Sequence, residues 1–380
     1  MGRFAGWLLV ACLGLAMPAH AVGSGALDAK LREADQVRTS NPKQFAALLE
    51  EIEAAGPRSR PQRERLAFLR GYQLARTGEL QAAIAAFEAL RTSTADPDLG
   101  FRAGAMLVNA YAITRDFRHG LMVAQDMVLD AEGVKDRESR HHGLLAIGVL
   151  YNQVGEHQLG ATFAERVLGD SPTVRNACIG ENLRVESLLL GRAEVGDAAA
   201  QGALRGCEAI GDATLAGFSR IYLARKWHAE GRTRDAVRLV EARLGEVEAT
   251  GYKRLIGEVH SLLAELRLAL GDVGPAERHA QAAIAYNVAL VDSLPLVVAY
   301  RTLADIAERR GDVSAALDLA KRFASAERGH RDDVASREMA YQIVRHQSLQ
   351  QAQQIELLNR QNEVLQLQQT VQQQSAQNSR

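Results

Sequence analysis

The sequence is poor in aromatic residues, proline and cysteine, and its charges are balanced. Phe, Trp and Tyr make up 5% of the 380 residues, and there are only 8 prolines and 3 cysteines. Sparse proline together with abundant Ala and Leu favours long helices. The formal net charge is −1, so no field of the whole chain attracts nucleic acid or an anionic membrane surface. We therefore predict an all-α protein without a nucleic-acid partner.

The motifs that usually mark catalysis are also missing. No lysine precedes serine or threonine, which excludes the Gly-Lys-Ser/Thr phosphate loop. His-Glu-x-x-His and Gly-x-Ser-x-Gly are absent as well. The neighbouring His141 and His142 would point to different sides of a helix, so they do not form a chelating pair. We predict no catalytic residue, no metal, no cofactor and no enzymatic activity.

One apolar segment stands out, and it lies at the N-terminus. It runs from Phe4 to Met17, and Ala19 and Ala21 then fit the small-residue pattern of a cleavage site. The run is shorter than the ~20 residues that a membrane-spanning helix needs. We predict a signal peptide, residues 1–21, cut after Ala21, and a periplasmic mature chain without a membrane span. An uncleaved anchor is one alternative, and a lipoprotein with the cleavage box Leu9-Val-Ala-Cys12 is another.

Removal of this segment leaves two cysteines, Cys178 and Cys207. Both fall within one predicted helical hairpin, on opposite sides of a turn at Gly196. An oxidising compartment permits them to form a disulfide. Two buried thiols are the alternative.

A helix–turn–helix pattern recurs along the chain. Its best copy surrounds Gly311 and Asp312, where a turn separates two segments with apolar residues at helical spacing. Matching turns lie at residues 78, 115, 155, 196, 231, 271 and 311, which gives steps of 37, 40, 41, 35, 40 and 40 residues. Two helices and their turns fill a period of about 40 residues. We predict a repeat array over residues 60–330, preceded by a capping helical hairpin over residues 22–56.

The small residues around these turns resemble those of the tetratricopeptide repeat. A Gly or Ala stands seven residues before the turn glycine and an Ala five residues after it, as in Ala264, Gly271 and Ala276. The units at Arg115 and Gly196 are degenerate, and the steps exceed the family's usual 34 residues. The resemblance implies a right-handed superhelical solenoid in which each hairpin buries its apolar face against its neighbours.

The same resemblance implies where a partner would bind. In tetratricopeptide repeats the first helix of each hairpin lines a concave face that grips an extended peptide. A plain solvated surface is the alternative. The positions that correspond to this face are Arg65, Phe68, Tyr72, Arg76, Asn109, Asn152, Gln153, Arg225, His228, Glu265, Arg301 and Asp305.

From residue 331 the chain changes character. No Gly or Pro follows Asp332 and Gln becomes abundant, so we predict one long helix over residues 331–380, which Gly329 could separate from the array. Heptad spacing predicts a coiled-coil homodimer, and a solvated extension of the last helix is the alternative. The predicted oligomerisation seam consists of Tyr341, Val344, Ile355, Leu358, Asn362 and Leu365.

Together these features predict a non-catalytic periplasmic scaffold that binds a protein or peptide through its concave face. A second interpretation rests on a further resemblance. A signal peptide, such hairpins and a Gln-rich terminal helix resemble the periplasmic sensory region of membrane-bound diguanylate cyclases and sensor kinases. That resemblance implies a detached or truncated input module without the transmembrane and catalytic parts.

Overall fold

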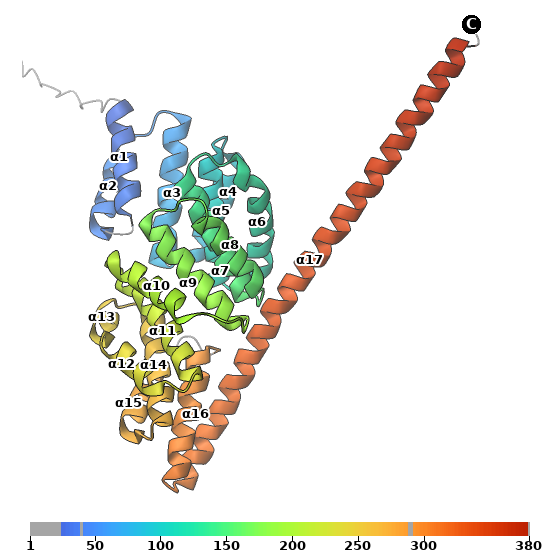
Figure 1. Cartoon of the computed structure of the whole chain (residues 1–380). Coiled ribbons are helices and arrows are strands. Elements are labelled where there is room, and N and C mark those ends of the chain that lie inside the picture. The colour runs from blue at the N-terminus through green and yellow to red at the C-terminus, as the bar shows by residue number, and fades with distance from the viewer. Residues whose placement is uncertain (1–23, 39–40, 288–291, 379–380) are drawn as a thin grey trace, which may run out of the picture. The chain divides into compact units, whose positions relative to one another are not determined.

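The structure is a computed structural model that describes residues 24–38, 41–287 and 292–378. Within these ranges the regular elements are 17 α-helices and one short 3-10 helix, with no strand (Figure 1). The all-α prediction is confirmed. The predicted signal peptide lies outside the described residues. No helix within these ranges combines the length and the apolar character needed to cross a membrane.

The helices form two compact units, and the boundary between them in the sequence falls within α4 (Leu80–Ser93). The first unit, up to Ala86, also contains α1 (Ser24–Val37), α2 (Pro42–Ala55) and α3 (Arg60–Thr77). α1 and α2 pair as a hairpin in the range predicted for the cap. The side chain of Asn41 accepts a hydrogen bond from a backbone N–H of the first turn of α2, which stabilises the start of that helix.

The second unit, from Phe87 onward, consists of successive pairs of a first and a second helix. Neighbouring first helices pack against each other, so the pairs form a helical-repeat array. The pairs are α5 (Pro97–Ile113) and α6 (Phe117–Asp130), α7 (Arg137–Gln153) and α8 (His157–Leu168), α9 (Val174–Leu190) and α10 (Asp197–Ala209), α11 (Ala213–Ala229) and α12 (Thr233–Glu241) with α13 (Leu244–Ala249), α14 (Lys253–Ala269) and α15 (Val273–Asn287), and α16 (Leu294–Arg309) and α17 (Val313–Asn378).

A residue in the left-handed conformation ends the first helix of each pair. Its φ lies between 73° and 88° at Gly155, Gly231, Gly271 and Gly311, where glycine avoids the steric cost of a Cβ. Arg115 and Arg192 adopt the same region, with φ of 64° and 56°. The assignment of the turn to Gly196 was wrong, because its φ is −66° and it precedes α10 as the N-cap. The chain turns earlier, at Arg192.

Small residues allow the two helices of a pair to approach closely. Gly148 on α7 faces Gly160 on α8, and a Cβ added to either would lie 3.2 to 3.3 Å from the carbonyl oxygen of the other. Side chains at these positions would push α7 and α8 apart. The small residues that carried the resemblance to the repeat family are therefore contact points between helices.

The two cysteines lie in one of several apolar clusters between the pairs. Cys178 on α9 and Cys207 on α10 are buried and bonded to each other, with a Cα–Cα distance of 5.0 Å. Leu204 and Leu223 belong to the same cluster. Of the two alternatives, a disulfide or two buried thiols, the structure has the disulfide. This bond joins the first and second helix of one pair.

The last helix, α17, runs for 66 residues without a break. The expectation that Gly329 could interrupt it was wrong. A Cβ at Gly329 would overlap the Asp292 carboxylate, so the glycine admits a close neighbour and does not end the helix. α17 pairs with α16 and then crosses to α6, far away in the sequence (Figure 1). α17 therefore contacts both its own partner helix α16 and the much earlier helix α6.

Candidate functional site: the first-helix face and the docked part of α17

Polar side chains converge on a face that four successive first helices share. These helices, α7, α9, α11 and α14, pack side by side in this order. We call the group formed by Asn152, Glu186, Tyr222, Arg254 and Glu258 the polar cluster. Its members interact with one another through hydrogen bonds and charge. It is notable because its interactions connect four successive repeats.

Glu186 is the centre of the polar cluster. Burial raises the pKa of its carboxyl group, and the negative charge of Glu258 raises it further. Hydrogen bonding by Tyr222 and Asn152, together with the positive charge of Arg254, opposes these effects without cancelling them. The ionised form of Glu186 is therefore less stable here than in water, and an added hydrogen-bond donor or cation would stabilise it.

The neighbours of Glu186 are themselves oriented by the array. The Asn152 side-chain oxygen interacts with Nδ1 of His157 at 2.6 Å, which leaves its amide group to face Glu186. Burial raises the pKa of the Tyr222 hydroxyl, and the charges of Glu186 and Glu258 add to this effect, so Tyr222 remains a neutral donor. Arg225 donates to Glu258 at 3.3 Å.

One segment of α17, residues 333–348, packs against α6 and the end of α7, and we call it the docked segment. Its Tyr341 and Val344 are 9% and 2% exposed and belong to the same apolar cluster as Leu121 and Tyr151. The Tyr341 ring meets the Tyr151 ring edge-on, with centroids 6.1 Å apart. Ser348 donates to the side chain of Gln125 at 2.8 Å. The docked segment is thus fixed by both apolar and polar contacts.

Charged contacts secure the other end of the docked segment. Arg337 donates to the main-chain carbonyl of Gln153 at 3.1 Å and pairs with Asp333 at 2.9 Å. Asp333 also pairs with Arg115 in the turn between α5 and α6. Burial lowers the pKa of Arg337, and repulsion by Arg115 and Arg254 adds to this effect. Arg254 belongs to the polar cluster, so the docked segment lies within electrostatic reach of that cluster.

The predicted partner-binding residues on α3 differ in accessibility. Phe68 is 3% exposed and therefore buried, so its assignment to a binding surface was wrong. The reason is that its periodic spacing also fits packing against neighbouring helices. Tyr72 is half-buried, edge-on to Phe45. Arg65 and Arg76 are exposed.

The later predicted residues mostly pair within the chain. Asn152 belongs to the polar cluster, and the carbonyl of Gln153 holds the docked segment. Arg301 and Glu265, both predicted, form an ion pair of 3.1 Å. The others lie on the first helices as follows: Asn109 half-buried, Arg225 paired with Glu258, His228 Nδ1 2.9 Å from the Thr233 hydroxyl, and Asp305 exposed.

Sequence reasoning missed four members of the polar cluster: Glu186, Tyr222, Arg254 and Glu258. The unit that contains Glu186 was aligned on Gly196, which is not the turn residue, so no position was assigned there. Tyr222 was placed on the apolar face because it lies between Ile221 and Leu223. A single charge in the apolar run Val185-Glu-Ser-Leu-Leu-Leu190 was the available signal.

The predicted oligomerisation seam is divided between two environments. Tyr341 and Val344 are buried against the array of their own chain, so they do not form a seam with a second chain in this structure. A heptad pattern indicates that one face of a helix is buried, but it does not indicate which surface covers that face. The remaining seam residues, Ile355, Leu358, Asn362 and Leu365, are exposed.

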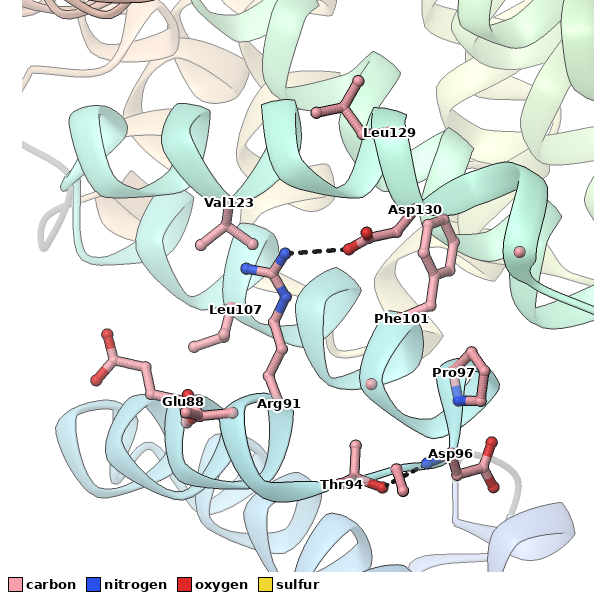
Figure 2. A pocket seen from close by; sticks show the side chains of 14 residues that line it. Glu88, Arg91, Thr94, Asp96, Pro97, Phe101, Leu107, Val123, Leu129 and Asp130 are labelled. Carbon is pink, nitrogen blue, oxygen red and sulfur yellow. Dashed lines mark hydrogen bonds and ion pairs between the residues drawn. The ribbon is translucent and has the colours of Figure 1, made fainter. Parts of the chain in front are cut away.

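A pocket of about 1000 Å³ lies elsewhere in the second unit, between the end of α4, α5 and α6. Figure 2 shows Arg91 reaching toward Asp130, with Leu107 and Val123 beside it. The distances from Arg91 to Asp126 and Asp130 are both 3.4 Å. None of the predicted site residues lines this pocket. Among the described residues, no group of three or more His, Cys, Asp or Glu side chains is arranged to hold a metal ion.

Comparison with known proteins identifies the fold. No protein-family model and no curated protein matches the sequence. A solved structure of a Rap protein with Competence and Sporulation Factor covers 84% of this chain and 99% of its own, with 12% identity and a TM-score of 0.57. NprR with its cognate peptide NprX covers 82% of each chain, with 13% identity and a TM-score of 0.51. The chain has a tetratricopeptide-like helical-repeat fold.

A third similar structure is a signal transduction ATPase with a tetratricopeptide repeat sensor, from Pyrococcus horikoshii. It shares 13% identity, with a TM-score of 0.54, and the match covers 80% of this chain and 46% of that one. At such identities the similarity establishes the tetratricopeptide-like fold, while function has to be argued from the side chains of this chain.

Proposed function

We propose that the protein is a non-catalytic scaffold that binds a peptide or an extended protein segment on its first-helix face. The polar cluster is the observation that carries this proposal. It places donors, carboxylates and an arginine on four successive first helices, as recognition of an extended main chain with charged side chains requires. The similar folds of Rap, complexed with Competence and Sporulation Factor, and of NprR, complexed with its cognate peptide NprX, support a peptide ligand.

The test begins with a phage-displayed library of random linear peptides selected on the purified chain. The double variant Glu186→Gln with Glu258→Gln keeps side-chain shape but removes both carboxylates. We expect it to bind a selected peptide at least about tenfold more weakly by fluorescence anisotropy, a loss of about 1.4 kcal/mol. Arg91→Gln, in the pocket of Figure 2, is the matched control and should bind normally. If Arg91→Gln weakens binding and the double variant does not, the pocket is the site and the proposal fails.

A second candidate function is sensory, and the unbroken α17 favours it. This helix contacts the array beside the polar cluster and then extends well past it. A ligand that changes the conformation of the array would thus change the position of α17, which extends beyond the array. An input module of a diguanylate cyclase or sensor kinase system requires such a link. Hydrogen exchange of the docked segment with and without a selected peptide tests this. Unchanged exchange at saturation would contradict it.

We further propose that the chain is exported to the periplasm and loses residues 1–21. The composition of this segment and the Cys178–Cys207 disulfide support export, because such bonds persist in oxidising compartments. Expression in a Gram-negative host should give a periplasmic product whose intact mass corresponds to a start at Val22. Ala21→Asp should block cleavage, because the site requires small residues. An acylated Cys12, or an uncut chain in the cytoplasm, would contradict this.

A further inference from the structure

The part of α17 that follows the docked segment carries exposed apolar side chains. Leu357, Val364, Leu367 and Val371 are 56%, 53%, 66% and 63% exposed. Exposed apolar side chains at regular spacing usually mark an interaction surface. Within the described residues, nothing covers this part of α17.

Leu357, Val364 and Val371 lie on the opposite side of α17 from the docked segment, and Leu367 lies at the edge of that side. The side chains that contact the array, Arg337, Tyr341 and Val344, follow one line along the helix. Val364 comes 27 residues after Arg337, which is about 7.5 turns at 3.6 residues per turn and places it half a turn away. Contact with the array and contact with a partner therefore use different faces of one helix.

The opposite face has a heptad pattern of its own, which we call the outer seam. Its apolar residues follow spacings of three and four or multiples of seven, as in a coiled coil. Met339 and Ile343 extend it alongside the docked segment, where they are 64% and 41% exposed. The outer seam consists of Met339, Ile343, Leu357, Val364, Leu367 and Val371.

We propose that the outer seam binds the outer seam of a second copy of this chain. A partner helix on the other side, along the predicted seam, would meet the array at Tyr341 and Val344, which are already buried. A partner on the outer side meets no such obstacle. The dimer thus leaves both arrays and both docked segments in place, and it goes beyond the peptide binding proposed above.

The charges of this region also favour a second copy over other partners. Residues 339–371 contain two arginines and two glutamates, Arg345, Arg360, Glu356 and Glu363. A balanced, sparse charge neither repels an identical helix nor attracts an anionic lipid surface or nucleic acid. Arg360, which lies on the outer side, is paired with Glu356 of its own helix.

Light scattering on the purified chain tests this proposal directly. We expect a dimer at micromolar concentration, and Val364→Lys with Leu367→Lys should weaken it at least about 100-fold, because two lysines per chain would enter the apolar contact. The matched control, Ile355→Lys with Asn362→Lys, adds the same charge on the other side and should remain dimeric. A monomeric wild type, or dissociation by the control pair alone, would overturn the proposal.

A cross-linking experiment keeps the proposal testable if the lysine variants fold poorly. Val364→Cys should be joined to its copy by a short bismaleimide, whereas Ile355→Cys should not. Cross-linking at Ile355 without cross-linking at Val364 would place the contact on the other side and refute the outer seam. Because no peptide ligand is present in either measurement, failure here would leave the peptide-binding proposal unaffected.

Discussion

Replacement of Val344 by aspartate is expected to detach α17 from the array. Val344 is 2% exposed in a cluster that includes Leu121 and Tyr151, and the new carboxylate would be buried there without a partner. Burial of an unpaired charge costs more free energy than the contacts of one valine contribute. We therefore expect the docking free energy to fall by about 4 kcal/mol. Amide exchange of residues 333–348 should become about 100-fold faster or more.

Gln342→Asp is the control for this experiment, because it adds the same charge at an exposed neighbouring position of the same helix. Its exchange should remain close to wild type. The exchange of α14 and α15 should stay unchanged in both variants, since the apolar clusters of these helices contain no residue of the docked segment. Wild-type protection of the docked segment in Val344→Asp would show that the segment is not held by this cluster.

Loss of the Cys178–Cys207 disulfide is expected to have an effect of similar size. The bond closes a loop with a sequence separation of 29 residues, and the chain-entropy model assigns such a loop about 3–4 kcal/mol. The variant Cys178→Ala with Cys207→Ala should therefore lower the thermal midpoint markedly. Because each repeat contacts mainly its neighbours, faster hydrogen exchange should be concentrated in α9 and α10.

Reductant supplies the control for the disulfide. The wild type treated with reductant should match the double alanine variant, and the variant itself should not respond to reductant. Thiol titration confirms that the bond has been reduced. A thermal midpoint that is unchanged in fully reduced wild type would contradict the expected contribution.

Much of the fold could be predicted because its signals are local. The turn glycines at positions 155, 231, 271 and 311 adopt the backbone region that glycine favours, and Gly148 faces Gly160 as the repeat pattern implied. Where a turn uses another residue, as at Arg192, the local signal is weak, and the nearby Gly196 resembles the turn residue instead. The repeat pattern is then out of register in this segment, so it does not place Glu186 in the candidate site.

The candidate site was less predictable, because it depends on which helices become neighbours. The spacing of Arg301 and Glu265 in the sequence indicates their faces, but their ion pair exists only after α14 and α16 pack together. The same holds for Glu186, whose raised pKa arises from burial and from Glu258 on a helix two repeats later. A charged residue within an apolar run indicates that its side chain has an unusual environment. It does not indicate which residue that side chain will contact.

The sequence by itself determined that the chain is a row of helical hairpins ending in one long helix, because periodicity, turns and small contact residues are properties of short segments. Only the tertiary structure decided what covers each face. Tyr341 and Val344 carry the spacing of a seam between chains, yet they are buried against α6 and α7 of their own chain. The physical reason is that a heptad requires burial of a helix face, and any apolar surface that the fold brings into reach satisfies it.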